Sequence, residues 1–267
     1  MPRIPAPRAK RTGTQTVDRS FQLLKEIAAR NAHGTTLPEL AAMLGLHRTT
    51  THRMLQCLVR NGAIRHEASS RRFVLGPLAV ELSIAARPQL DLRTLFAETV
   101  SRVAEQTGDT TFLILRSGND AVCIDRRLGS YPIKTVVVEV GTRRPLGIGA
   151  GSLAILSALP EIEAERIVRE NARRLAAYGR SPESLLKNAR AARKSAYVSS
   201  PVYGVDGAIA LGVPIFDSQA APVAGLSVAA ISTRMTGSRQ AALLKILRNE
   251  ARQMTELLRT TNIVDHG

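Results

Sequence analysis

The sequence predicts an α+β protein of two domains: an N-terminal winged helix-turn-helix domain and a larger domain with a mainly antiparallel sheet. Three observations lead to this prediction. At 267 residues the chain is long for one ordinary domain. Residues 36 to 62 have the pattern of two short helices joined by a tight turn. Beyond residue 109, six β-branched runs alternate with turn signals, and helical segments gather in the middle and at the two ends.

The first helix is predicted over residues 17 to 31, where apolar side chains recur at helical spacing. Before it, residues 1 to 15 contain proline, arginine, threonine and glycine with almost nothing to bury, so we expect a disordered basic arm. Such an arm can follow DNA phosphates, and it can equally be a solvated tail. The winged helix-turn-helix domain is therefore expected over residues 16 to 76.

Capping and turn signals predict the helix-turn-helix itself. Thr36 is an N-cap candidate, and Glu39, three residues later, completes a capping box for a helix over residues 37 to 44. Gly45 lies where the chain needs a left-handed turn residue. The second helix is expected over residues 48 to 61. Its predicted buried side consists of Leu55, Leu58 and Val59, with Met54 or Cys57 at the margins.

The start of this second helix carries polar and basic side chains. Threonine hydroxyls bond phosphates or base edges, and arginine binds guanine edges or phosphate oxygens. Any one of these residues alone is more simply a solvated helix face, but after a helix-turn signature the group predicts a helix that enters a DNA major groove. The predicted DNA-binding residues are His47, Arg48, Thr49, Thr50, Thr51, His52 and Arg53.

Two short extended runs, residues 63 to 65 and 72 to 75, flank a polar and basic tip and predict the hairpin of a wing. Arg71 and Arg72 are placed to reach adjacent phosphates, although a charged hairpin tip is as often a solvated turn. Both arginines therefore join the predicted DNA-binding set, and both interpretations stay open.

Residues 77 to 88 are predicted to link the two domains, with a helix over residues 78 to 86 that ends before Pro88. This segment is too apolar for a bare linker, so we expect it to pack against the other subunit of an oligomer. A longer amphipathic helix follows over residues 89 to 107 and begins the second domain, residues 89 to 267.

The second domain is predicted from β-branched runs that are separated by turns containing Gly, Asn or Asp. The expected strands cover residues 110 to 115, 121 to 124, 133 to 140, 197 to 202, 208 to 215 and 223 to 231. The expected helices cover residues 149 to 159, 161 to 177, 183 to 195 and 237 to 260.

No pattern for catalysis occurs in the second domain. The histidines lie outside its body, which removes most Ser/His and Cys/His mechanisms; they are His33, His47, His52, His66 and His266. Cys57 and Cys123 stand far apart without ligand spacing, so neither a disulfide framework nor a zinc site is predicted. Gly147, Gly149 and Gly151 have the wrong spacing for a dinucleotide loop. We therefore expect a binding domain without catalytic residues, metal or cofactor.

The charge distribution favours a polyanionic partner. The net charge is +15, and residues 1 to 86 hold 13 Lys and Arg against 5 Asp and Glu. No run approaches the roughly 20 apolar residues of a membrane span, and the N-terminus lacks the apolar segment of a secretory signal. We expect a cytoplasmic protein that binds double-stranded DNA and does not associate with a membrane.

In their order and spacing, six segments resemble the IclR family of bacterial transcriptional regulators over roughly residues 14 to 260. They are T-V-D-R-S-F-Q-L-L (16 to 24), L-P-E-L-A-A-M-L-G-L-H-R-T-T-T-H-R-M-L-Q-C-L (37 to 58), F-V-L-G (73 to 76), R-P-L-G-I-G-A-G-S-L-A-I-L-S-A-L-P (144 to 160), G-A-I-A-L-G-V-P-I-F-D (207 to 217) and L-S-V-A-A (226 to 230). The resemblance implies a winged helix-turn-helix, a linker helix and a GAF-like effector-binding domain. It also implies a repressor or activator that acts on operator DNA as a homodimer or a pair of dimers, with a small molecule changing its affinity or geometry.

The resemblance further implies where an effector would bind. The family pocket corresponds here to a loop and helix start, to positions on three strands and to an apolar cover. These residues are Ala150, Gly151, Ser200, Ala210, Ser227 and Ala229, with Ile133, Val136 and Leu146 as the cover. Members that bind small oxo-acids carry an acidic residue, a cysteine and a second serine in place of Ser200, Ala210 and Ala229. The pocket of this chain is thus less suited to a very small, highly polar acid.

Arg144 leads to a hypothesis about the effector. The position before Pro145 is often apolar in the family, and an arginine there can pair with a carboxylate. The hypothesis is a carboxylate with an apolar or aromatic body, and the alternative is an Arg144 that faces water. For the whole chain we favour a ligand-responsive, sequence-specific DNA-binding regulator. An architectural DNA binder without an effector remains the alternative, and an enzyme fused to a DNA-binding module is disfavoured by the positions of the histidines.

Overall fold

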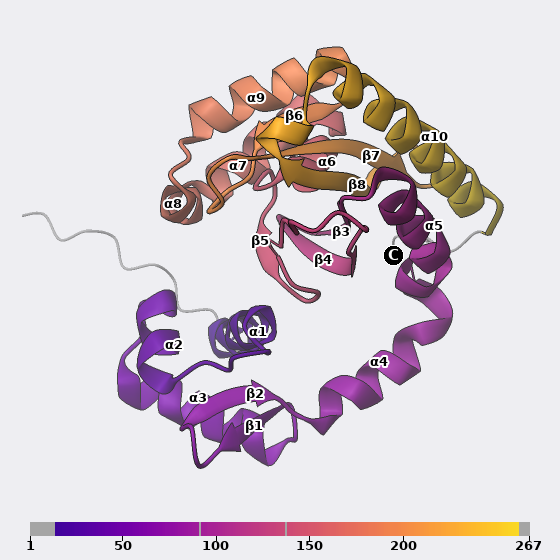
Figure 1. The fold of residues 1–267 in the computed structure, drawn as a ribbon. Coiled ribbons are helices and arrows are strands. Elements are labelled where there is room, and N and C mark those ends of the chain that lie inside the picture. Colours follow the sequence, from indigo (N-terminus) through magenta and orange to yellow (C-terminus); the bar gives the residue numbers. More distant parts are fainter. Residues whose placement is uncertain (1–13, 91, 137, 262–267) are drawn as a thin grey trace, which may run out of the picture. The chain divides into compact units, whose positions relative to one another are not determined.

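The computed structural model describes residues 14–90, 92–136 and 138–261, except for the side chains of residues 86–90 and 261 (Figure 1). The chain divides into two compact units, Met1–Ala85 and Ala86–Gly267, and each is considered by itself. Of the predicted basic arm, residues 1–13 lie outside the described residues, and Gln15 already belongs to the first helix. No helix in the described part of the chain combines the length and apolar character that crossing a membrane requires.

The N-terminal unit is a winged helix-turn-helix, as predicted. Its elements are α1 (Gln15–Ala29), α2 (Leu37–Leu44), α3 (Arg48–Arg60), β1 (Ile64–Glu67) and β2 (Arg72–Leu75), followed by α4 (Pro77–Leu90), which continues into the second unit. β1 and β2 pair in antiparallel register, with Ile64 opposite Leu75. The core is formed by Leu23, Ile27, Leu40, Met54, Leu55, Ile64 and Phe73.

Local interactions explain the turn between α2 and α3. The Glu39 carboxylate accepts hydrogen bonds from the backbone N–H of Thr36 at 2.7 Å and from its hydroxyl at 2.9 Å, so Glu39 caps the start of α2 as predicted. These bonds hold the pKa of Glu39 below its usual range. Gly45 ends α2 at φ +62°, a left-handed conformation that glycine adopts without a steric penalty. Both predicted signals are confirmed.

The buried side of α3 differs from the predicted one. Thr51, Met54 and Leu55 are buried, whereas Leu58 and Val59 are only half-buried and Cys57 is exposed. The most deeply buried residues therefore lie nearer the start of the helix than predicted. With about 3.6 residues per turn, positions 51, 54, 55 and 58 share one face. The inward face is therefore set by contacts with α1 and α2 rather than by apolarity alone.

The helix α4 is longer than predicted. It runs through Pro88 to Leu90 instead of ending before that proline. A proline within a helix removes one backbone hydrogen bond, and α4 continues despite this loss.

The C-terminal unit contains one antiparallel sheet of six strands in the order β5-β4-β3-β8-β7-β6. The strands are β3 (Thr110–Ser117), β4 (Asp120–Arg127), β5 (Arg143–Pro145), β6 (Val198–Pro201), β7 (Ala208–Phe216) and β8 (Pro222–Ile231). The predicted α+β class with a largely antiparallel sheet is confirmed.

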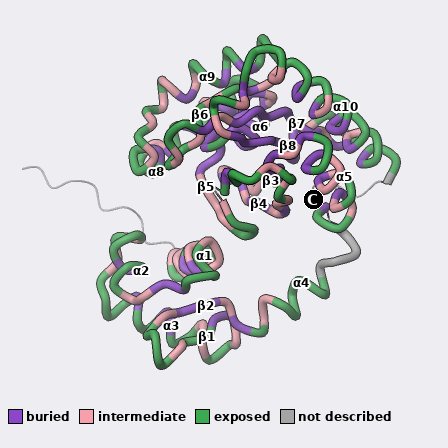
Figure 2. The backbone as a smooth tube through the Cα atoms, viewed as in Figure 1, coloured by how far each residue is buried: buried purple, intermediate pink, exposed green. Residues whose placement is uncertain are grey.

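Helices cover both faces of this sheet. α5 (Leu92–Thr107) and α10 (Gly237–Thr261) pack on one face. The other face is covered by α6 (Ala150–Ala158), α7 (Glu161–Glu170), α8 (Ala172–Leu175) with the 3-10 turn η1 (Ala176–Tyr178), and α9 (Pro182–Ser195). A second 3-10 turn, η2 (Ser232–Arg234), follows β8. Successive side chains of a strand point to opposite faces of the sheet. Leu211 therefore packs in the core on the α10 side, and Ala210 in the core on the α6 side. Figure 2 shows β7 and β8 buried beneath helices with exposed outer faces.

The predicted strand over residues 133 to 140 is wrong. No strand forms in the described part of this segment, and β5 lies beside β4 instead. The backbone of Cys123 on β4 exchanges hydrogen bonds with Gly141 at 2.8 Å and Thr142 at 3.0 Å, which occupies the edge of β4. The β-branched run has no free edge there, so Ile133, Val136 and Val140 stay exposed. β-branched residues favour a strand where they can pack on a half-buried pleated sheet. The described part of this segment is not paired into a sheet, so that preference has no effect here.

Candidate DNA-binding surface and ligand pocket

The outward face of α3 presents a basic and polar stripe. Thr49, Arg53, Gln56 and Arg60 are exposed and follow one another at helical spacing, on the side opposite Thr51. The helix contains no acidic residue that would repel DNA. Arginine can bind guanine or phosphate, and glutamine can bind adenine. Gln56 and Arg60 were absent from the predicted set, and their spacing of seven and eleven residues from Thr49 is the signal that identifies them.

The other residues predicted on α3 fall into two groups. His47, Arg48, Thr50 and His52 are exposed beside the stripe. Thr51 is fully buried, and its hydroxyl donates a hydrogen bond to the His47 carbonyl at 3.2 Å. Thr51 therefore cannot contact a groove, and its assignment as a DNA-binding residue is corrected. The reason is that position 51 shares the inward helix face of the core residues.

The two arginines of the wing have different surroundings. Arg71, at the tip between β1 and β2, is exposed and has a left-handed backbone with φ +54°. Arg72 donates to the Gly34 carbonyl at 3.0 Å and lies 3.9 Å from the Glu39 carboxylate. Arg72 thus holds the wing against the start of α2, whereas Arg71 is open to a phosphate.

Replacing Arg53 with alanine is expected to weaken operator binding by about 1 to 3 kcal/mol, because a groove or phosphate contact is lost. Arg48→Ala should act similarly. The measurement is fluorescence anisotropy at fixed salt, with a labelled duplex recovered by selection from random sequence. Arg173→Ala, which removes an exposed charge from the other unit, is the matched control. A normal footprint from the double variant Arg48→Ala/Arg53→Ala would show that α3 is not the recognition helix.

A pocket in the C-terminal unit opens between the sheet and the start of α6. It encloses about 580 Å³ of empty space, a volume that includes solvent at its open mouth. Its apolar lining includes Phe112, Ile114 and Ala121 from β3 and β4. Arg144 and Ser227 are among its few polar groups. In the described part of the chain, no cluster of three or more His, Cys, Asp or Glu side chains is placed to hold a metal ion.

Six of the ten residues implied by the family resemblance line this pocket: Arg144, Ala150, Gly151, Ala210, Ser227 and Ala229. The other four lie elsewhere. Leu146 is fully buried in the core beneath α6, and Ser200 lines a smaller neighbouring cavity. Ile133 and Val136 are exposed on the segment before β5, which does not fold over the pocket as a strand. Val138 and Val202 line the pocket in their place.

Arg144 lies in the pocket against two aromatic rings. Its guanidinium carbon is 5.8 Å from the centroid of the Tyr203 ring and 6.0 Å from that of Tyr178, and the two rings are 5.0 Å apart. Burial lowers the pKa of Arg144, because desolvation disfavours the charged form. The sequence prediction missed both tyrosines, although they are two of only four in the chain.

The start of α6 adds hydrogen-bond donors to the pocket. Gly149 caps the helix at φ +96°, and the first N–H groups of a helix have no partner within it. Ser227 is only 5% exposed and lines the same pocket, so its hydroxyl lies among buried groups close to these donors. A buried hydroxyl beside a helix N-terminus suits an anionic or strongly polar ligand group.

Two glycines allow α6 to approach the sheet this closely. A Cβ atom at Gly212 would lie 2.5 Å from the Ala150 carbonyl oxygen, and one at Gly225 would lie 2.3 Å from the Gly151 carbonyl oxygen. Both distances are shorter than van der Waals contact. The pocket therefore depends on bare backbone at these two positions of β7 and β8.

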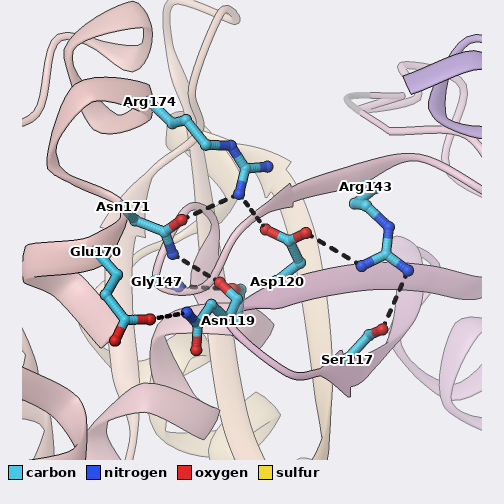
Figure 3. A network of polar contacts seen from close by, with 9 residues as sticks. Ser117, Asn119, Asp120, Arg143, Gly147, Glu170, Asn171 and Arg174 are labelled. Carbon is cyan, nitrogen blue, oxygen red and sulfur yellow. Dashed lines mark hydrogen bonds and ion pairs between the residues drawn. The ribbon is translucent and has the colours of Figure 1, made fainter. Parts of the chain in front are cut away.

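A buried carboxylate anchors the strand that carries Arg144. Asp120, 8% exposed, accepts hydrogen bonds from Arg143 Nη1 at 3.1 Å and from Arg174 Nη1 at 2.5 Å (Figure 3). Arg143 precedes Arg144 on β5, and Arg174 lies on α8, which leads into the turn that bears Tyr178. Asp120 thus ties β5, which carries Arg144, and α8 to the β3–β4 hairpin.

Backbone groups strengthen the same anchor. The Asn119 carbonyl accepts hydrogen bonds from the Asn171 side chain at 2.7 Å and from the Leu146 backbone N–H at 3.0 Å. These contacts join the β3–β4 turn to the start of α8 and to the residue after β5. Figure 3 shows the bond between Asn171 and Asn119. The arrangement holds residues from three distant segments around one cavity.

Two family models match the chain. The model for the C-terminal region of bacterial IclR transcriptional regulators matches residues 85–256, and the IclR helix-turn-helix domain matches residues 16–68. Together they span both units of the structure.

Curated relatives cover most of the chain. The HTH-type transcriptional regulator KipR of Bacillus subtilis is 28% identical over 90% of this chain and 96% of its own length. The transcriptional repressor IclR of Escherichia coli is 24% identical over 90% of this chain and 89% of its own length. Both are named as regulators of transcription.

Solved structures share the fold. An IclR transcriptional regulator from Silicibacter matches with a TM-score of 0.76 and 21% identity over 91% of this chain and 96% of its own. An IclR homologue from Microbacterium hydrocarbonoxydans, complexed with 4-hydroxybenzoate, matches with a TM-score of 0.68 and 21% identity over 92% of this chain and all of its own.

Proposed function

The chain belongs to the IclR family of bacterial transcriptional regulators, and on that premise we propose that it binds operator DNA sequence-specifically and senses a small carboxylate with an apolar or aromatic body. It is a regulator of transcription and not an enzyme. Regulators of this family bind operator DNA and small-molecule effectors. The proposal places this action in the cytoplasm, where operator DNA lies.

The DNA-binding part of the proposal rests on the exposed face of α3 and on the wing. The recognition helix would be α3, with Arg48, Thr49, Arg53 and Arg60 toward the groove, while Arg71 on the wing would contact phosphate. The basic charge of the chain supports attraction to DNA over distance.

A homodimer, or a pair of dimers, is proposed from α4. Its apolar side chains Val80, Leu82 and Ile84 are 62%, 61% and 61% exposed, and they need cover from another surface. A second copy of α4 supplies such cover and places two recognition helices at half-sites about one helical turn apart. A palindromic footprint is the expected observation.

One observation carries the effector class: Arg144 is desolvated within a mainly apolar pocket. A carboxylate beside Arg144 would form charge-assisted hydrogen bonds, and its body would lie on Phe112, Ile114 and Tyr203. The 4-hydroxybenzoate in the related structure is an aromatic carboxylate, which supports this class.

A thermal-shift screen of small carboxylic acids tests the effector class, because a ligand that binds the folded state raises its melting temperature. Arg144→Gln should weaken the best acid by about 2 kcal/mol, or roughly 30-fold, through loss of a charged hydrogen bond. Arg173→Gln, which removes an exposed charge that lines neither cavity, should leave its affinity unchanged. Undiminished affinity in Arg144→Gln would contradict the proposed carboxylate contact.

Competition between the selected duplex and a scrambled duplex distinguishes a sequence-specific regulator from an architectural protein that binds DNA through charge alone. A regulator should prefer its selected duplex over a scrambled one by about 10³ or more at physiological salt. An architectural binder would show a steep salt dependence and no such preference.

A further inference from the structure

A second, smaller cavity adjoins the ligand pocket. It encloses about 390 Å³ of empty space, including its opening. The two cavities share four lining residues, Ile148, Gly149, Pro201 and Tyr203. They are therefore neighbouring lobes on either side of a common wall. Because the shared residues are mostly apolar, the body of one ligand can lie along them while its ends enter different lobes.

Each lobe contains one arginine. Arg144 lines the larger lobe and Arg180 the smaller one, and no Asp or Glu lies among the described residues that line either lobe. Arg180 is half-buried, and its side chain forms no ion pair or hydrogen bond with any described residue. Two cations in adjoining lobes, without a lining acid, produce a positive potential that favours a ligand with two negative charges.

Tyr203 lines both lobes and lies beside Arg144. Its ring centroid is 5.8 Å from the guanidinium carbon of Arg144, and the same residue lines the lobe of Arg180. Its hydroxyl donates to the Ala177 carbonyl at 3.1 Å, which fixes the ring against the turn that leads to Arg180. The polar ends of the double cavity are thus separated by an aromatic and apolar middle.

We propose that Arg180 forms a second anion subsite and that the effector is a dicarboxylate, or a similar dianion, with an apolar or aromatic spacer. One carboxylate pairs with Arg144 and the other with Arg180. Ser200 and Asn188, which line the smaller lobe, supply neutral hydrogen-bonding groups for the second carboxylate. This proposal rests on the proposed function, because it extends the carboxylate site at Arg144.

Calorimetric titration of the full chain tests the second subsite. The probes are linear dicarboxylates from succinate to suberate and terephthalate, each compared with the monocarboxylate of the same carbon skeleton. For the best spacer, the dicarboxylate should bind at least about tenfold more tightly than its monocarboxylate partner. Arg180→Gln should remove this advantage while leaving the monocarboxylate affinity within about twofold, and Arg180→Lys should retain part of it. Arg173→Gln is the control for a general loss of positive charge.

The outcomes separate this proposal from the proposed function. If monocarboxylates bind wild-type protein through Arg144 and no dicarboxylate binds more tightly, the second subsite is refuted while the carboxylate effector stands. A dicarboxylate advantage that survives Arg180→Gln also refutes it. If no carboxylate binds, both proposals fail. A thermal melt of each unliganded variant shows whether it is folded. If Arg180→Gln does not fold, Arg180→Lys becomes the test, because it keeps the positive charge and should retain part of the dicarboxylate advantage.

Discussion

Replacing Gly225 with alanine is expected to lower the free energy of unfolding of the C-terminal unit by about 3 kcal/mol, near the upper end for overpacked substitutions. The new Cβ would lie 2.3 Å from the Gly151 carbonyl oxygen and 2.9 Å from its carbonyl carbon. Both atoms are backbone, so no side-chain rotation relieves the overlap, and α6 must move from the sheet. Since Gly151 and Ser227 line the pocket, ligand affinity should fall with stability.

Urea unfolding and the ligand-induced thermal shift measure the two effects. Gly237→Ala is the matched control, because Gly237 begins α10 and a Cβ added there would meet no atom within 4 Å. If Gly225→Ala unfolds at the same urea concentration as Gly237→Ala, α6 does not pack on β8 through bare backbone.

Replacing Asp120 with alanine should also lower the free energy of unfolding by about 3 kcal/mol. Removing one partner of a buried ion pair leaves an uncompensated charge, which costs about 3 to 5 kcal/mol. The lower end applies here, because the Arg174 side chain is 42% exposed and can be solvated, whereas that of Arg143 is only 19% exposed. Release of β5 and α8 should displace Arg144 and Tyr178 and weaken carboxylate binding.

Chemical denaturation and ligand titration test this prediction. The control is Glu256→Gln, because Glu256 is exposed and pairs with Arg259 on the same helix, where such pairs contribute less than about 1 kcal/mol. A loss no larger in Asp120→Ala than in Glu256→Gln would contradict the anchoring role of Asp120.

The winged helix-turn-helix was predictable because its signals act over a few residues. Glu39 reaches back to Thr36, and Gly45 adopts the left-handed turn that ends α2. Hydrophobic periodicity placed most helices and strands within a few residues of their ends. Residues 133 to 140 misled the prediction, because β-branched residues favour a strand only where a partner edge is available, and Gly141 and Thr142 already bind the edge of β4.

Residue-level assignments on α3 were less predictable than the helix itself. Thr49 and Thr51 are chemically identical, yet Thr49 is exposed and Thr51 is buried with a hydrogen bond to His47. A polar side chain that returns its hydroxyl to the helix backbone can enter a core, so polarity alone does not identify the outward face.

Local sequence was sufficient for the fold class, the helix-turn-helix and the basic character of the exposed face of α3, because caps, turns and periodicity depend on neighbouring residues. By contrast, only the packing of distant segments brings Arg144, Tyr178 and Tyr203 together. The same packing joins Asp120 to Arg143 and Arg174. These residues come from strands, turns and a helix far apart in the chain. No local pattern encodes their distances, because the sheet register and the approach of α6 to bare glycine backbone set them.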